Sequence, residues 1–320
     1  MKRIGVLTSG GDAPGMNAAI RAVVRCAIEK DMEVYGISRG YEGLMDGEIE
    51  KMERSSVGDI LHRGGTILKT ARSKRFTTEE GVRHAKTMLD TFGIEGLVVI
   101  GGDGSLHGGL ELSRLGIPVM GIPGTIDNDL GYTDFTIGFD TAVSTVLEAV
   151  SKLRDTSSSH ERTTVIEVMG RHCGDIALYS GLAGGAESVM VPEIPYDLNE
   201  ICRKVVIGSN RKKQHSIIIK AEGVDISSQE LTETIEKNTG KETRLVVLSY
   251  LQRGGVPTTS DRVIATLMGA KAVELLDEGS DSKAVGVVDG KIVAYDLEEA
   301  LEQTREFKRD IYDLIGVLSK

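Results

Sequence analysis

The chain has 320 residues, of which 40% are hydrophobic and 27% are charged, and its formal net charge at pH 7 is −10. This acidic balance disfavours nonspecific binding to nucleic acid or to a membrane surface. The absence of tryptophan and an aromatic content of 4% also argue against base-stacking platforms.

The three cysteines, Cys26, Cys173 and Cys202, are odd in number and show no CxxC spacing. This argues against a disulfide framework and a zinc site, and it fits a reducing compartment. No stretch approaches 18 consecutive apolar residues, and the first residues run directly into a strand pattern without a signal-peptide core. We therefore expect a cytoplasmic protein.

Apolar runs rich in β-branched residues predict six strands, at residues 4–7, 97–100, 119–122, 164–168, 216–219 and 245–248. Helical patterns lie between many of them, at residues 16–29, 80–91, 141–154, 199–209 and 261–276. Alternating strands and helices predict an α/β fold of mainly parallel sheets with helices on both faces. The length allows two lobes, each with its own core.

Glycine-rich turns follow most of the predicted strands, at residues 8–15, 101–105, 124–129, 169–175, 221–224 and 252–255. Parallel sheets bind ligands at the carboxyl ends of their strands, so we expect these turns to line one cleft. The first turn is of the anion-binding sort but lacks the GxxxxGK[ST] spacing of a Walker A loop. The GxGxxG fingerprint also fails after Gly102, because His107 stands where its last glycine belongs.

Aspartates stand among these glycines, where they would repel a phosphate unless a divalent cation or a proton transfer intervened. Asp103 lies between two glycines, so no neighbouring side chain is expected to shield it from Mg²⁺. The alternative is that Asp103 caps the following helix. In Asp127-Asn128-Asp129, an extended backbone would point both carboxylates the same way; a solvated loop is the alternative. Together the motifs predict metal-assisted phosphoryl transfer.

The chain resembles the bacterial ATP-dependent 6-phosphofructokinases from its first strand to its last helix. The resemblance is carried by LTSGGDAPGMN at residues 7–17, GGDGS at 101–105, PGTIDND at 123–129, MGR at 169–171, AEG at 221–223 and QRGG at 252–255. It implies transfer of the ATP γ-phosphoryl group to the 1-hydroxyl of fructose 6-phosphate, giving fructose 1,6-bisphosphate and ADP. It also implies a homotetramer whose active and effector sites are shared between subunits.

The resemblance further implies two Rossmann-like lobes, each a mainly parallel sheet with helices on both faces. Residues 1–138 and 252–302 would form the ATP-binding lobe. Residues 139–251 and 303–320 would form the lobe that binds fructose 6-phosphate. The chain would thus leave the first lobe, build the second and return.

The resemblance also assigns roles to individual residues. Asp127 would be the general base, Asp103 with Asp129 would hold Mg²⁺, and Gly11 with Arg72 would stabilise charge on the moving phosphoryl group. The ATP site would be lined by Gly11, Arg72, Ser73, Gly102, Asp103, Gly104 and Ser105. The sugar would be held by Thr125, Ile126, Met169, Gly170, Arg171 and Glu222, with Thr125 and Arg171 also serving catalysis. Its 6-phosphate would meet Arg253 and Tyr250, plus Arg162 and Arg244 of a neighbouring subunit.

Tyr250 departs from the family pattern, because many relatives have histidine there. A tyrosine hydroxyl can donate a hydrogen bond but carries no positive charge near neutral pH.

A second set of charged residues matches the family's effector pocket, which binds activating ADP or GDP and inhibitory phosphoenolpyruvate. Its members are Arg21, Arg25, Arg54, Asp59, Arg154, Gly185, Glu187, Arg211, Lys212 and Lys213. Arg21 and Arg25 are four residues apart and share a helix face, where Glu29 could relieve Arg25. A solvated basic face is the alternative.

Three other functions are weighed. Pyrophosphate-dependent phosphofructokinases use the same scaffold but typically carry Asp in place of Gly104 and Lys in place of Gly124, so these glycines favour ATP. A non-catalytic nucleotide-sensing α/β module would keep the glycine turns without needing Asp127 and Asp103 together. An NAD-dependent oxidoreductase is disfavoured by the failed fingerprint.

Overall fold

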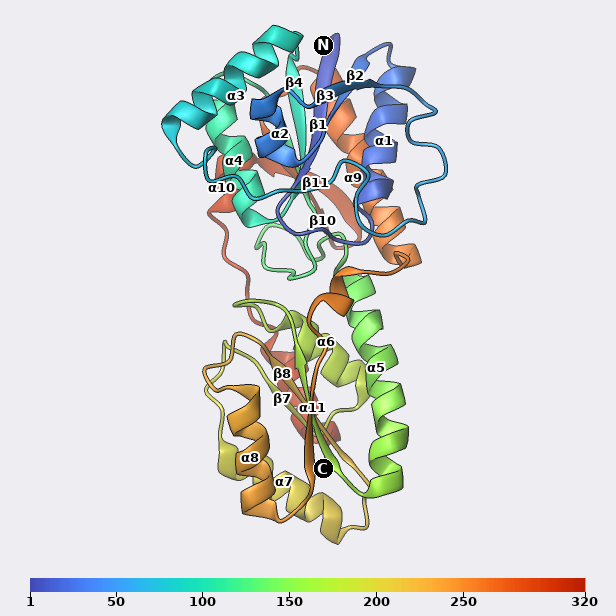
Figure 1. The fold of residues 1–320 in the computed structure, drawn as a ribbon, viewed down its shortest axis with the longest axis vertical. Helices are drawn as coiled ribbons and strands as arrows, with labels where there is room; N and C mark the ends of the chain where they lie inside the picture. The colour runs from blue at the N-terminus through green and yellow to red at the C-terminus, as the bar shows by residue number, and fades with distance from the viewer. Residues whose placement is uncertain (320) are drawn as a thin grey trace. The chain divides into compact units, whose positions relative to one another are not determined.

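A computed structural model describes residues 1–319 (Figure 1). The chain divides into two compact units. Unit 1 comprises residues 1–126, 130–141 and 253–305, and unit 2 comprises residues 127–129, 142–252 and 306 onward. Among the described residues, no helix combines the length and the apolar character needed to span a membrane.

Unit 1 is built on a seven-stranded sheet in the order β11-β10-β5-β4-β1-β2-β3. Its five inner strands run parallel, and β3 and β11 pair antiparallel at the two edges. The strands are β1 (Arg3–Ser9), β2 (Glu33–Ile37), β3 (Ile49–Met52), β4 (Gly96–Gly101), β5 (Val119–Pro123), β10 (Lys283–Val288) and β11 (Lys291–Asp296). β4 and β5 are buried along their whole length, as expected of strands covered on both faces.

Helices cover both faces of this sheet, as Figure 1 shows, with α1 and α9 on one face and α3, α4 and α10 on the other. They are α1 (Met16–Glu29), α2 (Gly40–Asp46), α3 (Glu79–Phe92), α4 (Asp103–Arg114), α9 (Thr259–Asp277) and α10 (Leu297–Leu301). Gly269 lets α9 approach α1 closely, because a Cβ there would lie 2.8 Å from the Ala19 carbonyl oxygen.

Unit 2 contains a four-stranded, all-parallel sheet in the order β7-β8-β6-β9. Its strands are β6 (Thr163–Val168), β7 (Ser188–Met190), β8 (Ser216–Ala221) and β9 (Thr243–Val247). The helices are α5 (Phe139–His160), α6 (Asp175–Gly184), α7 (Leu198–Asn210), α8 (Ser228–Thr239) and α11 (Arg309–Leu318), and the 3₁₀ helix η1 spans Ser249–Arg253. α5 begins with the last residues of unit 1 and continues through unit 2.

The predicted α/β fold class is confirmed, and all six predicted strands and five predicted helices are present. The six strands were an undercount, because β2, β3, β7, β10 and β11 were missed. β3 and β11 are sheet edges with several exposed or partly exposed residues, so they give no long apolar run. β7 has only three residues and is too short to give one.

Candidate active site

The turn after β1 brings a glycine-rich backbone against an arginine, all within unit 1. Gly10 and Gly15 have φ of 84° and 108°, a backbone region that side chains other than glycine rarely adopt. A Cβ at Gly11 would lie 2.5 Å from Nη1 of Arg253, whose guanidinium also donates to the Asp12 carbonyl oxygen at 3.3 Å. A side chain at position 11 would therefore displace this guanidinium from its place over the turn.

The turn after β4 places Asp103 at the first position of α4, with Gly102 as the N-cap residue. The predicted alternative, Asp103 as a helix cap, is therefore wrong. Its side chain is half-exposed, and Oδ1 lies 3.2 Å from Nδ1 of His107, one helical turn on. The expectation that no side chain would shield Asp103 is wrong too, because residues four apart share a helix face.

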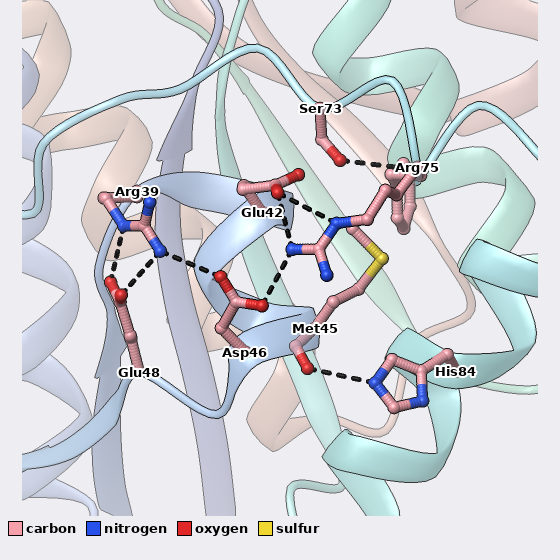
Figure 2. A network of polar contacts seen from close by, with 9 residues as sticks. Arg39, Glu42, Met45, Asp46, Glu48, Ser73, Arg75 and His84 are labelled. Carbon is pink, nitrogen blue, oxygen red and sulfur yellow. Dashed lines mark hydrogen bonds and ion pairs between the residues drawn. The ribbon is translucent and has the colours of Figure 1, made fainter.

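The loop that carries Arg72 and Ser73 is anchored by a network of ion pairs on α2, shown in Figure 2. Arg75 of this loop lies 2.5 Å from Glu42 and 2.7 Å from Asp46. Arg39 binds Asp46 on its other side, at 2.9 Å, and Glu48 at 2.6 Å. The pairs are partly exposed, so each contributes little stability alone, but the shared carboxylate of Asp46 couples them.

The same loop is tied to the turn after β4 through aromatic rings. Ser73 Oγ accepts from the backbone N–H of Phe76, whose ring stacks on Tyr41 at a centroid distance of 3.9 Å. The Tyr41 hydroxyl donates to the Ser105 carbonyl oxygen at 2.6 Å. Arg72 itself is exposed beside these residues. No sequence pattern predicted this link, because Tyr41 and Phe76 are far apart in the chain.

The turn after β5 buries the aspartate predicted to be the general base. Asp127 is 1% exposed and Thr125 is also buried, so the solvated-loop alternative is wrong. The predicted extended backbone is wrong as well, because Asn128 has a φ of 54° in the left-handed region. Asparagine tolerates this conformation, and here its Nδ2 donates to Oδ2 of buried Asp175 at 2.8 Å.

Within unit 2, Asp127 forms an ion pair with an arginine from the turn after β6. Arg171 Nε lies 3.2 Å from Asp127 Oδ2. The Arg171 backbone has a φ of 52°, and its N–H donates to Glu222 Oε1 at 2.9 Å. Gly223 is required beside it, because a Cβ there would lie 1.9 Å from the Arg171 carbonyl oxygen. The turns after β6 and β8 thus fix the guanidinium that faces the buried carboxylate.

Two groups to which the sequence analysis assigned no role support these turns, although Gln252 belongs to the QRGG motif. Gln252 is fully buried, and its Oε1 accepts from the Met169 N–H at 3.2 Å. Glu193 accepts from the Gly174 N–H at 2.7 Å, and burial raises the pKa of its carboxyl. Neither lies in a recognisable catalytic pattern, so only the tertiary contacts could have found them.

Arg162 and Arg244 lie at the other end of the sheet of unit 2. Arg162 precedes β6, whereas Met169, Gly170 and Arg171 follow it, and the six residues of β6 span about 20 Å. Arg244 pairs with the beginning of β6 from β9. Glu242 binds both arginines, with Arg162 Nε at 2.7 Å, and these contacts lower the pKa of the Glu242 carboxyl.

Tyr250 and Arg253 both lie in η1, where the chain passes from unit 2 back to unit 1. Tyr250 is 77% exposed. Arg253 lies against Gly11, as described above, so its predicted contact with a sugar phosphate stays a prediction.

The predicted effector residues fall into two sets. Arg21, Arg25, Arg54 and Asp59 belong to unit 1, and the remaining six belong to unit 2. We expected Glu29 to relieve Arg25, but Glu29 forms its ion pair with Arg54, at 2.5 Å. The reason is that the loop after β3 brings Arg54 to the end of α1.

In unit 2, basic groups gather around a buried carboxylate. Lys213 Nζ lies 2.5 Å from Oε1 of Glu187, which is buried. Both residues, with Arg211, line a cavity of about 570 Å³ between α7 and α11. Arg154 donates to the Gly184 carbonyl oxygen and lies beside Gly185. Lys212 lines a different cavity, of about 320 Å³, together with Arg162.

The family model described as phosphofructokinase matches residues 3–276. The chain belongs to the phosphofructokinase family.

Curated relatives agree with this assignment. An ATP-dependent 6-phosphofructokinase from Clostridium acetobutylicum is 59% identical over 320 residues, which is 100% of both chains. Phosphofructokinase from Saccharomyces cerevisiae is 35% identical with a TM-score of 0.89; the match covers 100% of this chain and 48% of the yeast chain. A pyrophosphate-dependent phosphofructokinase from Marinobacter aquaeolei is 23% identical, with a TM-score of 0.85, over 98% of this chain and 91% of that chain. At that identity the likeness shows the fold alone.

Proposed function

We propose that this phosphofructokinase carries out its ATP-dependent 6-phosphofructokinase reaction with Asp127 as the general base. The observation that carries the proposal is the buried Asp127 carboxylate at a strand end, 3.2 Å from the Arg171 guanidinium. The carboxylate takes the proton of the sugar 1-hydroxyl while that oxygen bonds to the γ-phosphorus of ATP. The bond from the γ-phosphorus to the bridging oxygen breaks, and ADP leaves.

Unit 1 binds ATP and unit 2 binds fructose 6-phosphate in this proposal. The N–H of Gly11 and the exposed Arg72 guanidinium stabilise charge on the transferred group, because phosphoryl transfer depends mostly on positioning and charge stabilisation. Gly102 is the N-cap residue of α4, and Gly104 and Ser105 lie in its first turn, where the helix N-terminus suits phosphate. Thr125, Ile126, Met169, Gly170, Arg171 and Glu222 hold the sugar.

Asp103 fits a role in holding Mg²⁺. Its half-exposed carboxylate stands beside Gly104, where a Cβ would meet nothing within 4 Å, so a nucleotide phosphate has room to approach. Mg²⁺ is usually held by one or two carboxylates plus substrate phosphates, so a single exposed aspartate beside a phosphate site suits it. When bound it would neutralise phosphate charge, with Asp129 as the second carboxylate.

The 6-phosphate of the sugar is held across subunits. Because β6 separates Arg162 and Arg244 from the Met169–Arg171 turn of their own chain, they serve a neighbouring chain's site in a homotetramer. Tyr250 and Arg253 complete the phosphate contacts.

Replacing the base should lower turnover strongly. Asp127→Ser is expected to reduce kcat by about 10²–10⁴, the usual worth of a general base, with little change in ATP affinity. Steady-state kinetics and calorimetric ATP binding measure the two effects, and Asp225→Ser, an exposed aspartate of unit 2, is the matched control. A variant with near-normal kcat would remove Asp127 from the mechanism.

The phosphoryl donor should be ATP and not pyrophosphate. Gly104 and Gly124 stand where pyrophosphate-dependent enzymes typically carry Asp and Lys, and a Cβ at buried Gly124 would lie 3.0 Å from both Ile100 and Met16, which would have to shift to admit a side chain. The purified protein is assayed with fructose 6-phosphate and Mg²⁺, once with ATP and once with pyrophosphate. Robust turnover with pyrophosphate and none with ATP would contradict the proposal.

Sharing of sites between subunits predicts complementation. Asp127→Ser and Arg162→Ala should each be impaired alone, because each removes one half of every site. In mixed tetramers about a quarter of the sites regain both wild-type residues by random pairing, so activity should exceed that of either parent. Mixing the two folded parents without subunit exchange is the control. Mixed tetramers no more active than the parents would show that Arg162 serves its own chain.

The proposal also assigns the binding of ADP or GDP and of phosphoenolpyruvate to the predicted effector residues. Phosphoenolpyruvate should raise the apparent fructose 6-phosphate requirement, and ADP with Mg²⁺ should reverse this, with coupling of about 1–3 kcal/mol. Arg154→Ala should weaken both effects while leaving unregulated turnover intact, and Lys152→Ala on the same helix is the control. Saturation curves that ignore millimolar phosphoenolpyruvate would reduce the cluster to a solvated basic surface.

A further inference from the structure

Asp261, in the first turn of α9, is a fully buried carboxylate that the proposed chemistry does not use. Its Oδ1 accepts from the Gly138 N–H at 2.8 Å. Its Oδ2 accepts from both the N–H and the hydroxyl of Thr141, at 2.8 and 2.5 Å. The Thr141 hydroxyl also accepts from the Thr258 N–H at 3.1 Å. Asp261 therefore fixes the segment that leads into α5.

The segment fixed by Asp261 also holds the end of β5 and the turn that follows it. The Ile137 N–H donates to the Pro123 carbonyl oxygen at 2.9 Å, and the Thr136 hydroxyl donates to the Thr125 carbonyl oxygen at 2.6 Å. Pro123 is the last residue of β5, and Thr125 lies in the turn after it. Asp127 follows two residues after Thr125 in the same turn. Short contacts thus lead from Asp261 to the backbone of Thr125, two residues before the proposed base.

The turn after β1 packs on the same segment. A Cβ at Gly138 would lie 2.7 Å from the Cβ of Ala13, and a Cβ at Gly15 would lie 2.6 Å from Ile137 Cγ2. Both glycines have a φ above 100°. The turn with Gly11 and the turn with Asp127 therefore rest on one short stretch of backbone, residues 136–138, and Asp261 anchors it.

We propose that Asp261 is a positioning residue for phosphoryl transfer, which acts through residues 136–138 to hold both the Thr125 backbone, which leads to Asp127, and the turn that carries Gly11. The inference rests on the proposed role of Asp127. A misplacement of about 1 Å by a change away from the reacting atoms can cost about 10²-fold in rate. The expected signature is a loss of kcat with little change in KM.

The ionisation of Asp261 separates this role from a structural one. Burial raises the pKa of Asp261 to about 6, aided by the charge of Asp140, while the hydrogen bonds from Thr141 and Gly138 oppose the rise. A carboxyl whose folded pKa is raised contributes most to stability below its unfolded pKa of 3.8, and that contribution declines up to about pH 6. Neutralising Asp261 therefore does not remove a charge on which folding at pH 7 depends.

The test compares Asp261→Asn with Asp140→Asn, which neutralises an exposed aspartate in the first turn of α5. We expect Asp261→Asn to lower kcat by about 10- to 100-fold with near-normal KM values, and Asp140→Asn to leave kcat, KM and the melting temperature unchanged. The ratio of wild-type to Asp261→Asn kcat should be largest above about pH 6 and should shrink below it, because protonated aspartate resembles asparagine.

Thr141→Val and Thr141→Ser provide a second pair if Asp261→Asn folds poorly. Valine removes the hydroxyl that Asp261 binds and serine restores it, so we expect a kcat loss in the first variant and recovery in the second. Wild-type kcat in folded Asp261→Asn, or equal kcat in the two Thr141 variants, would overturn the inference. Wild-type enzyme and Asp127→Ser are assayed alongside. Near-normal kcat in Asp127→Ser would contradict the proposed base, whereas the Asp261 and Thr141 variants test the positioning role.

Discussion

The ion pair of Asp127 and Arg171 is the interaction on which the site depends. A carboxylate that is 1% exposed loses nearly all its hydration, so it needs a cation or several donors to stay in place. Arg171 supplies that charge from a half-exposed position, where its guanidinium reaches both the buried carboxylate and solvent. The left-handed backbone of Arg171, its hydrogen bond to Glu222 and the neighbouring Gly223 all serve to aim this one side chain.

The other turns at the strand ends are supported by side chains that do not belong to the proposed site themselves. The Arg75 network and the Tyr41–Phe76 stack hold the loop and turn proposed to bind ATP. Gln252 and Glu193 hold backbone N–H groups in the turn after β6. Turns rich in glycine lose much conformational entropy on ordering, and buried polar side chains offset that cost. Positioning of this kind is what phosphoryl transfer demands.

The sequence predicted the inner strands and long helices well, because they are long apolar or amphipathic segments whose pattern is local. Edge strands such as β11 are half-exposed and gave no comparable signal. In the site, the burial of Asp127 followed from the apolar strand before it. The conformation of Asn128 did not follow, because its partner Asp175 is 47 residues away. Asp261 looks like an ordinary aspartate in a first helical turn, and only its contacts distinguish it. The roles carried over from the family stay predictions.

The placement of Glu242 has a consequence for dilute enzyme. In one chain this carboxylate neutralises Arg162 and Arg244, which stand a strand's length from the turns that hold the sugar. In the proposed tetramer, a dissociated subunit would keep the proposed base and nucleotide turns but would lack the two arginines proposed to come from its neighbour. Specific activity would then depend on protein concentration, and a substrate that bridges two chains would favour the assembled form by mass action.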